Sequence, residues 1–221
     1  MQPTIHHKLM SNIQSCKRCL YSSTHPLGLT IDDDGICSGC RIHEEKDSID
    51  WDTKFKELER IVQTNKKRIG NKGFDCIVPI TGGGDSYFIV HMVKNVLGMN
   101  PLLVKYNSHY NTKVGIRNVA NLATVFDCDV VESTLSPELL KKITRHTLDK
   151  YGSMYWHVLA GHLTFPVQTA TRYRIPLIIW GVQPWSEQTG MFSHLDAVEM
   201  TERCRKEHGL MGVSAQNIIN E

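Results

Sequence analysis

The sequence predicts an α/β fold in which a parallel sheet carries helices on both faces, preceded by a small cysteine-rich region. From residue 74 onward, short apolar runs of strand length alternate with longer segments of helical periodicity. Strands that alternate with helices are typical of βαβ units, whose sheets are parallel and covered on both sides. The first 45 residues are instead polar and turn-rich, and they contain four of the seven cysteines. We therefore expect two regions, residues 1–48 and residues 49–221.

The larger region is expected to begin with a helix from Asp50 to Ile69, which Asp50 or Asp52 is placed to cap. Helical spacing puts its apolar residues on one face: Trp51, Phe55, Leu58, Ile61 and Val62. The elements expected to follow are a strand at 74–80, a helix at 86–98, a strand at 100–107, a helix at 111–127, a strand at 128–134, a helix at 136–151, a helical stretch at 155–173 and a strand at 175–181.

Local signals define several of these helices. Gly98 is expected to end the helix at 86–98. Ser136, in "SPEL", is expected to cap the helix at 136–151. Pro166 should kink or split the stretch at 155–173. The inner side of the helix at 111–127 is predicted to consist of Val114, Val119, Leu122 and Phe126.

Composition excludes several classes of protein. The chain has 221 residues, 41% hydrophobic and 22% charged, which is ordinary for a globular protein. A net charge of +2 gives no basic field that would argue for nucleic acid. No window has the roughly 18 apolar residues of a membrane span, and the N-terminus lacks the apolar core of a signal peptide. We therefore expect a cytoplasmic protein.

The cysteine-rich region contains two paired motifs, "CKRC" with Cys16 and Cys19, and "CSGC" with Cys37 and Cys40, separated by 17 residues. Two such knuckles can bring four thiolates into a tetrahedron around Zn²⁺. Four protein ligands leave no open position, so we predict structural zinc, with an iron–sulfur cluster as the alternative. The remaining cysteines are scattered and are interpreted as small core residues: Cys76, Cys128 and Cys204.

A glycine-rich turn, "TGGGDS", stands between the strand at 74–80 and the helix at 86–98. It has neither the lysine of a Walker loop nor the spacing of a dinucleotide fingerprint. It still suits an anion: Gly82, Gly83 and Gly84 let backbone N–H groups face phosphate oxygens, and the helix start adds positive potential. The hydroxyls of Thr81 and Ser86 are candidate phosphate donors. Asp85 either binds Mg²⁺ that bridges the phosphates or caps the helix.

In this strand–turn–helix context, "TGGGDS" resembles the S-G-G-x-D-S loop of the ATP pyrophosphatase (PP-loop) superfamily, with threonine for the first serine. The resemblance implies an adenine nucleotide alpha hydrolase-like fold. It also implies cleavage of ATP between the α- and β-phosphates. A carbonyl oxygen is adenylated, pyrophosphate leaves, and a nitrogen or sulfur nucleophile displaces AMP. Asp85, Ser86 and a later acid would then be the catalytic residues.

A longer resemblance rests on the cysteine pairs and on "GFDCIVPITGGGDS", "NTKVGIRNVANL", "FPVQTATRYRIPLIIWG" and "VEMTERCRKEHGL". Together these look like the N-acetyl sugar amidotransferase family of surface-polysaccharide (lipopolysaccharide) and nonulosonic (pseudaminic) acid biosynthesis in bacteria. The resemblance implies a nucleotide-linked acetamido sugar as acceptor, whose acetamido group becomes acetamidino. The ammonia is expected from a separate glutaminase resembling the amidotransferase subunit of histidine biosynthesis, through a cyclase-like subunit.

The chain departs from that family in three places. The family motif Gly-Glu-Asn-Pro-x-x-Glu reads "GVQPWSE" here, so Gly181 and Glu187 match while Val182 replaces an acid. The segment "WHVLAGH" lacks expected cysteines, and the family's C-terminal portion is expected to be absent. Gly181 is predicted to contact the nucleotide. Glu187 is either a metal or substrate ligand or an exposed loop acid.

Other residues have weaker signals. Tyr106, Asn107 and Ser108 end the strand at 100–107, where adenine or ribose contacts are expected by position. The histidines show no metal spacing, so hydrogen-bonded or surface roles are expected for His109, His157, His162 and His194. Two other functions stay open: a tRNA thiolase of the same superfamily, and a catalytically degenerate nucleotide-binding or assembly subunit.

Overall fold

The computed structural model describes residues 13–25, 28–70, 73–181, 193–194, 202, 206, 210 and 212–219. They belong to two compact units. The first comprises the described residues up to Lys54 together with Ser193 and His194, and the second comprises those from Phe55 to Gly181 together with the described residues after 199. Among the described residues, no helix has the length and apolar character needed to cross a membrane.

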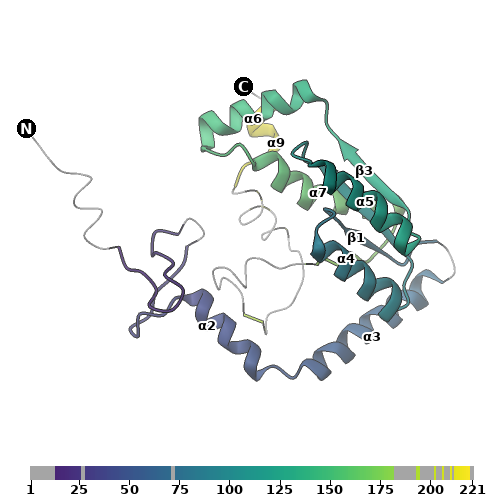
Figure 1. Cartoon of the computed structure of the whole chain (residues 1–221), viewed down its shortest axis with the longest axis horizontal. Coiled ribbons are helices and arrows are strands. Elements are labelled where there is room, and N and C mark those ends of the chain that lie inside the picture. The colour runs from purple at the N-terminus through teal and green to yellow at the C-terminus, as the bar shows by residue number, and fades with distance from the viewer. Residues whose placement is uncertain are drawn as a thin grey trace, which may run out of the picture. The chain divides into compact units, whose positions relative to one another are not determined.

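The second unit contains the predicted parallel sheet. Strands β1 (Cys76–Pro79), β2 (Pro101–Asn107) and β3 (Val130–Thr134) lie in the order β1-β2-β3, and both pairs are parallel. β1 and β2 are buried along most of their length, which explains their continuous apolar runs. The α/β prediction with a parallel sheet is therefore confirmed (Figure 1).

The predicted strand at 175–181 pairs with β1 through a single parallel bridge between Ile77 and Ile178. The N–H of Ile77 donates to the Leu177 carbonyl at 2.9 Å, and the N–H of Ile179 donates to the Ile77 carbonyl at 2.9 Å. Because β2 occupies the other edge of β1, the chain runs outward from β1 to β3 and then returns to the opposite side of β1. Such a reversal of strand order is the point where open parallel sheets bind ligands, at the carboxyl ends of the strands.

Helices cover both faces of the sheet, as predicted. On one face lie α3 (Trp51–Ile69), α4 (Gly84–His91) with its π-helical continuation η2 (Met92–Val96), and α5 (Lys113–Phe126). The core on this face includes Val62, Cys76, Val78, Val90, Leu103 and Leu122. On the other face α7 (Trp156–Tyr173) packs on β1 and β2, where the core includes Ile77, Leu102, Val104 and Ala170.

Most helix ends follow their local sequence. The Asp50 carboxylate accepts a hydrogen bond from the N–H of Thr53 at 3.0 Å and so caps α3. Ser136 caps α6 (Pro137–Tyr151) by accepting from the N–H of Leu139 at 3.3 Å. Gly98, with φ of +59°, ends the helix that begins at Gly84. Of the two effects predicted for Pro166, a kink or a split, the split does not occur, because α7 runs through Pro166 as one helix.

Two predicted apolar faces are only partly correct. In α3, Leu58 and Val62 pack on the core, but the other three apolar residues are exposed: Trp51, Phe55 and Ile61. In α5, Val119, Leu122 and Phe126 pack inward as predicted, whereas Val114 is 55% exposed. Helical spacing places these residues on a common stripe, but only part of that stripe packs on the core.

The remaining elements are short. In the first unit, α2 (Ser38–Glu45) is followed by the 3₁₀ turn η1 (Lys46–Ser48), and the Glu45 carboxylate accepts hydrogen bonds from Ser193 Oγ at 2.8 Å and the His194 N–H at 3.0 Å. In the second unit, α9 (Ala215–Ile219) contacts α6. The Trp156 indole donates to the Leu210 carbonyl at 3.1 Å, which attaches this part of the chain to the start of α7.

Candidate functional site

The glycine turn lies at the carboxyl end of β1, beside the reversal of strand order. β1 ends at Pro79 and α4 begins at Gly84, so the turn is only a few residues long. Gly82 has φ of +85°, and a Cβ there would lie 2.7 Å from Cγ2 of Val119 in α5 and 3.2 Å from the Gly115 carbonyl oxygen. Both the backbone conformation and the space therefore require glycine at this position.

The Ser86 hydroxyl holds the turn in shape. Ser86 is 5% exposed, and its Oγ accepts hydrogen bonds from the backbone N–H groups of Thr81 at 2.9 Å and Gly82 at 3.3 Å. The Ser86 Oγ also lies 3.4 Å from Oγ1 of Thr81, and Thr81 is exposed. The two predicted donors are thus brought together. Ser86 organises the backbone of the turn, and the Thr81 hydroxyl lies at the surface.

Three successive backbone donors remain for an anion. The N–H groups of Gly83, Gly84 and Asp85 have no hydrogen-bond partner among the residues that the structure describes. Gly84 and Asp85 are the first residues of α4, so these donors coincide with the positive end of the helix dipole. A Cβ built on Gly84 would meet nothing within 4 Å among the described residues, so the space around this residue is open.

Asp85 is exposed and lies in the first turn of α4. The residue at the N-cap position is Gly83, which makes no side-chain cap, so Asp85 does not cap this helix. Within the described part of the chain, its carboxylate has no hydrogen-bond or ion-pair partner. Of the two roles predicted for Asp85, capping is therefore wrong, and the carboxylate stands beside the free N–H groups as a potential metal ligand.

Alanine substitutions of Gly82 and Gly84 should have different effects on stability, because only Gly82 is closely packed. We expect Gly82→Ala to destabilise the protein by about 1–3 kcal/mol, because it forces a left-handed conformation on alanine and a clash with Val119. Gly84→Ala should change the free energy of unfolding by less than about 0.5 kcal/mol, since its surroundings are open. Urea denaturation of the two variants measures this; equal effects would contradict the packing assigned to Gly82.

Of the two site residues predicted after the fourth strand, the structure describes Gly181 but not Glu187. Gly181 follows the bridge to β1, and a Cβ built on it would lie 3.5 Å from Cγ2 of Ile89, which places the end of that strand against α4. Glu187 lies outside the described residues, as does Val182. At the end of β2, the Asn107 side chain accepts from the His109 N–H at 2.9 Å and donates to Thr134 Oγ1 at 3.2 Å, so it is used within the turn.

Sequence reasoning missed a buried cation near the turn. Lys105, 7% exposed, shares the face of β2 that carries Leu103, toward α4 and α5. Its Nζ lies 2.9 Å from the Glu132 carboxylate on β3, its register partner. The register that pairs Pro79 with Val104 continues with Ile80 beside Lys105, one residue before the glycine turn. The sequence did offer one signal for this residue, because Lys105 is the single lysine in an otherwise apolar strand. Its place near the glycine turn follows only from the pairing of β2 with β1.

The four cysteines of the first unit form one group. Their sulfurs all lie within 4.8 Å of one another, with Cys16 to Cys40 at 3.9 Å and Cys19 to Cys37 at 3.5 Å. Zn–S bonds of about 2.3 Å put tetrahedral sulfurs about 3.8 Å apart, so the four thiols fit a single ion. Cys37 also begins α2 as its N-cap residue, so the ligand set and the helix share one residue.

Electrostatics in this group favours a cation. Hydrogen bonds from backbone N–H groups, chiefly that of Cys19, lower the pKa of the Cys16 thiol to about 6, against its burial. Burial and the neighbouring thiols raise the pKa of Cys40 to about 12, and burial raises that of Cys37. Four clustered thiols therefore cannot all ionise alone. A divalent ion supplies the charge that lets them do so.

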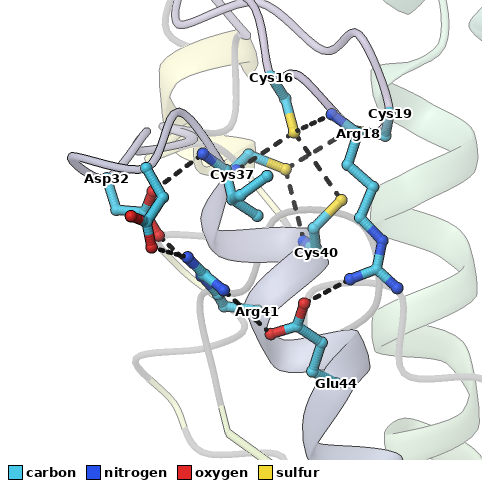
Figure 2. A network of polar contacts seen from close by, with 10 residues as sticks. Cys16, Arg18, Cys19, Asp32, Cys37, Cys40, Arg41 and Glu44 are labelled. Atoms are coloured by element: carbon cyan, nitrogen blue, oxygen red, sulfur yellow. Dashed lines mark hydrogen bonds and ion pairs between the residues drawn. The ribbon is translucent and has the colours of Figure 1, made fainter.

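A network of ion pairs surrounds the cysteines on the outside (Figure 2). The Arg41 guanidinium of α2 contacts Asp32 at 2.7 Å, Asp34 at 2.6 Å and Glu44 at 3.3 Å. Glu44 also pairs with Arg18, which lies between the first two cysteines in sequence. Each exposed pair contributes little to stability, but together they connect both knuckle loops to α2. The network supports the loops that present the thiols.

Comparisons with known proteins leave the family of this chain open. No family model matches it. An uncharacterized protein of Methanocaldococcus jannaschii is 27% identical over 116 residues, 52% of this chain and 41% of that protein. The chain thus spans about two fifths of that relative's length.

Two solved structures show limited similarity. One is the NH3-dependent NAD synthetase of Campylobacter jejuni, with a TM-score of 0.48 and 13% identity over 66% of this chain and 62% of that one. The other is the NMN synthetase of Francisella tularensis, with a TM-score of 0.47 and 12% identity over 62% of this chain and 57% of that one. The chain covers less than two thirds of either structure.

Proposed function

We propose that this chain carries the nucleotide site of an ATP-dependent, AMP-forming amidotransferase that converts a sugar acetamido group into an acetamidino group. The observation that carries the proposal is the turn at the carboxyl end of β1. There, three N–H groups and the carboxylate of Asp85, all without a partner in the part of the chain that the structure describes, lie together at the start of α4. Backbone donors at a helix N-terminus suit phosphate oxygens. A carboxylate beside them is compatible with polyphosphate when Mg²⁺ bridges the two.

The absence of a lysine from the turn bears on which bond of ATP is broken. A Walker lysine holds the β- and γ-phosphates while the γ-phosphoryl group is transferred. In this turn the donors come from successive backbone groups, which suits a pyrophosphate that leaves as one unit. The chain would therefore contribute binding and orientation: Ser86 fixes the turn, and Asp85 would hold the metal. Mg²⁺ would neutralise charge on the leaving pyrophosphate.

Cleavage between the α- and β-phosphates of ATP defines the proposed reaction. The acetamido oxygen attacks the α-phosphorus, and pyrophosphate departs. Ammonia then adds to the activated carbon, and AMP leaves with the former amide oxygen, so NH replaces O. Ammonia is proposed to come from elsewhere, since the described residues outside the knuckle include no reactive thiol for glutamine hydrolysis. Burial raises the pKa of Cys76 to about 12 and also raises that of Cys128. A glutaminase with a cyclase-like subunit is the proposed source.

The thiolase alternative is weaker for the same reason. A sulfur transfer enzyme needs an accessible thiolate. Among the described cysteines, Cys76 is fully buried, burial raises the pKa of Cys128, and the knuckle thiols form a group that could hold a metal ion. We therefore assign the knuckle a structural role, with Zn²⁺ bound by Cys16, Cys19, Cys37 and Cys40. The location proposed for the protein is the cytoplasm, where ATP and nucleotide-linked sugars are available.

The proposal is tested by incubating the protein with ATP, Mg²⁺, ammonium chloride and a panel of UDP- and CMP-linked acetamido sugars. Pyrophosphate and AMP are measured, and the sugar product is examined by mass spectrometry. We expect AMP formation that depends on the sugar, with NH in place of one oxygen in the product. Release of γ-phosphate with ADP instead of pyrophosphate with AMP would contradict the proposed cut. Failure to bind ATP would exclude the enzyme altogether.

A further inference from the structure

The helix α2 connects the cysteine group to a contact with a much later part of the chain. Two of the four thiols stand at its start, since Cys37 is the N-cap residue and Cys40 lies in the first turn. Glu45 is the last residue of the same helix. An α-helix rises 1.5 Å per residue, so the eight residues of α2 span about 12 Å. Glu45 is therefore held at a fixed distance from the thiols.

The Glu45 carboxylate accepts two hydrogen bonds from residues that are distant in sequence. Its Oε2 accepts from Oγ of Ser193 at 2.8 Å and from the N–H of His194 at 3.0 Å. All three residues are half-buried and belong to the first unit. Hydrogen bonds to an ionised acceptor are about twice as strong as those between neutral groups, so one carboxylate can fix both residues. We call this contact the Glu45 anchor.

The end of a helix is an unfavourable place for an acid that has no partner. The C-terminal end of α2 carries partial negative charge, which opposes the charge of Glu45. Hydrogen bonds from Ser193 and from the His194 N–H nevertheless lower the pKa of the Glu45 carboxyl, against the effect of burial. The ionised carboxylate is thus stabilised by partners outside its own helix.

The stretch of chain before Ser193 begins at a second point of attachment. Gly181 follows the bridge that joins the strand at 175–181 to β1, and a Cβ built on it would lie 3.5 Å from Cγ2 of Ile89 in α4. A stretch that is held at both ends samples fewer conformations than one that is held at a single end. Glu187, which lies outside the described residues, stands between these two attachments in the sequence.

We propose that Glu45 is a positioning residue, through which the zinc-bound first unit holds the end of the stretch that follows the strand at 175–181. Zinc orders the loops that present the thiols, α2 begins in those loops, and Glu45 at its other end fixes Ser193 and His194. The consequence for turnover rests on the proposed function. Release of the Glu45 anchor would leave Glu187 without a fixed position, whereas the backbone donors of the glycine turn would still bind ATP.

Hydrogen exchange resolved to single residues tests the Glu45 anchor on the full chain, because the His194 N–H is itself a donor in the contact. Glu45→Ala removes the acceptor, and Glu45→Gln keeps an acceptor oxygen but loses the charge. Asp47→Ala is the matched control, since Asp47 is an exposed acid just beyond α2 in the same unit. Zinc is removed from wild type with a chelator, and the zinc content of every variant is measured by mass spectrometry.

In Glu45→Ala we expect the His194 N–H to exchange at least about tenfold faster than in wild type, as for loss of a hydrogen bond to a charged group. Glu45→Gln should lie between these two, and Asp47→Ala should match wild type. Every variant should keep one zinc per chain and the wild-type protection of residues 13–45. Removal of zinc from wild type should release the His194 N–H together with residues 13–45. Protection of the His194 N–H that persists in Glu45→Ala, or after zinc removal, would overturn the proposal.

Turnover tests the positioning role of Glu45. The kcat of sugar-dependent pyrophosphate release should fall at least about tenfold in Glu45→Ala and recover in part in Glu45→Gln. The affinity for ATP should stay within about twofold of wild type. A wild-type kcat in Glu45→Ala, with the His194 N–H released, would overturn the positioning role. If wild type itself showed no turnover, the proposed function would fail, and hydrogen exchange would still decide whether the Glu45 anchor exists.

Discussion

Replacement of Cys37 by serine is expected to remove zinc from the protein and to unfold the first unit. Cys37 is buried, and its Sγ lies 3.5 Å from that of Cys19, so the substitution removes one of the four metal ligands. Serine can still cap α2 at this N-cap position, so the loss tests the metal group and not the helix start. The apolar cluster in this unit is small, consisting chiefly of Cys16, Leu29 and Cys37. Such a core cannot hold a fold by itself. In comparable small domains, the binding free energy of structural Zn²⁺ contributes about 10–16 kcal/mol to folding.

The measurement is zinc content by mass spectrometry of the purified protein, together with hydrogen exchange of residues 13–45. Cys128→Ser is the matched control, because Cys128 is a half-buried cysteine outside the knuckle. The Cys128→Ser variant should retain one zinc per chain and the wild-type protection of residues 13–45 from hydrogen exchange. Since zinc must displace protons from Cys37 and Cys40, whose pKa values are raised, wild type should also lose zinc as the pH falls. Full zinc content in Cys37→Ser would contradict a four-cysteine site.

Asp85→Ala is expected to reduce sugar-dependent pyrophosphate release by at least about 100-fold, because the Mg²⁺ proposed to neutralise the leaving group would lose the carboxylate of Asp85 as a ligand. The carboxylate is exposed and has no partner among the described residues, so its removal should leave the free energy of unfolding within about 0.5 kcal/mol of wild type. Steady-state kinetics with varied Mg²⁺ measures the effect. Zinc content should not change.

Asp52→Ala is the matched control for this variant, since Asp52 also lies in the first turn of a helix, α3. It should have wild-type activity, which would show that removal of a helix-start carboxylate is not itself harmful. If Asp85→Ala turned over within a few-fold of wild type, the metal-binding role of Asp85 would be excluded. If Asp85→Ala lost zinc as well, the variant would be misfolded. Its low activity would then say nothing for the role.

The sequence by itself determined the layers of the fold and the two local motifs. Strand and helix periods differ, so the alternation after residue 74 is visible without tertiary contacts, as are the caps at Asp50 and Ser136. The cysteine pairs and the glycine turn are likewise local, because their geometry depends on spacing along the chain. Gly82 needs its positive φ within a six-residue motif, and the four thiols need only two tight knuckles to meet.

Only the tertiary structure decided which residues stand together at the edge of the sheet. Spacing could not show that Asp85 fails to cap α4, or that Val114 and Trp51 stay exposed, because a helix has more apolar surface than its neighbours cover. His157 looked like any other histidine in the sequence. Its buried Nε2, which has no partner among the described residues, arises because α7 packs on β2, whose last residue lies about 50 residues away along the chain. Contacts between distant segments depend on register and on crossover, and neither is recorded in a local pattern.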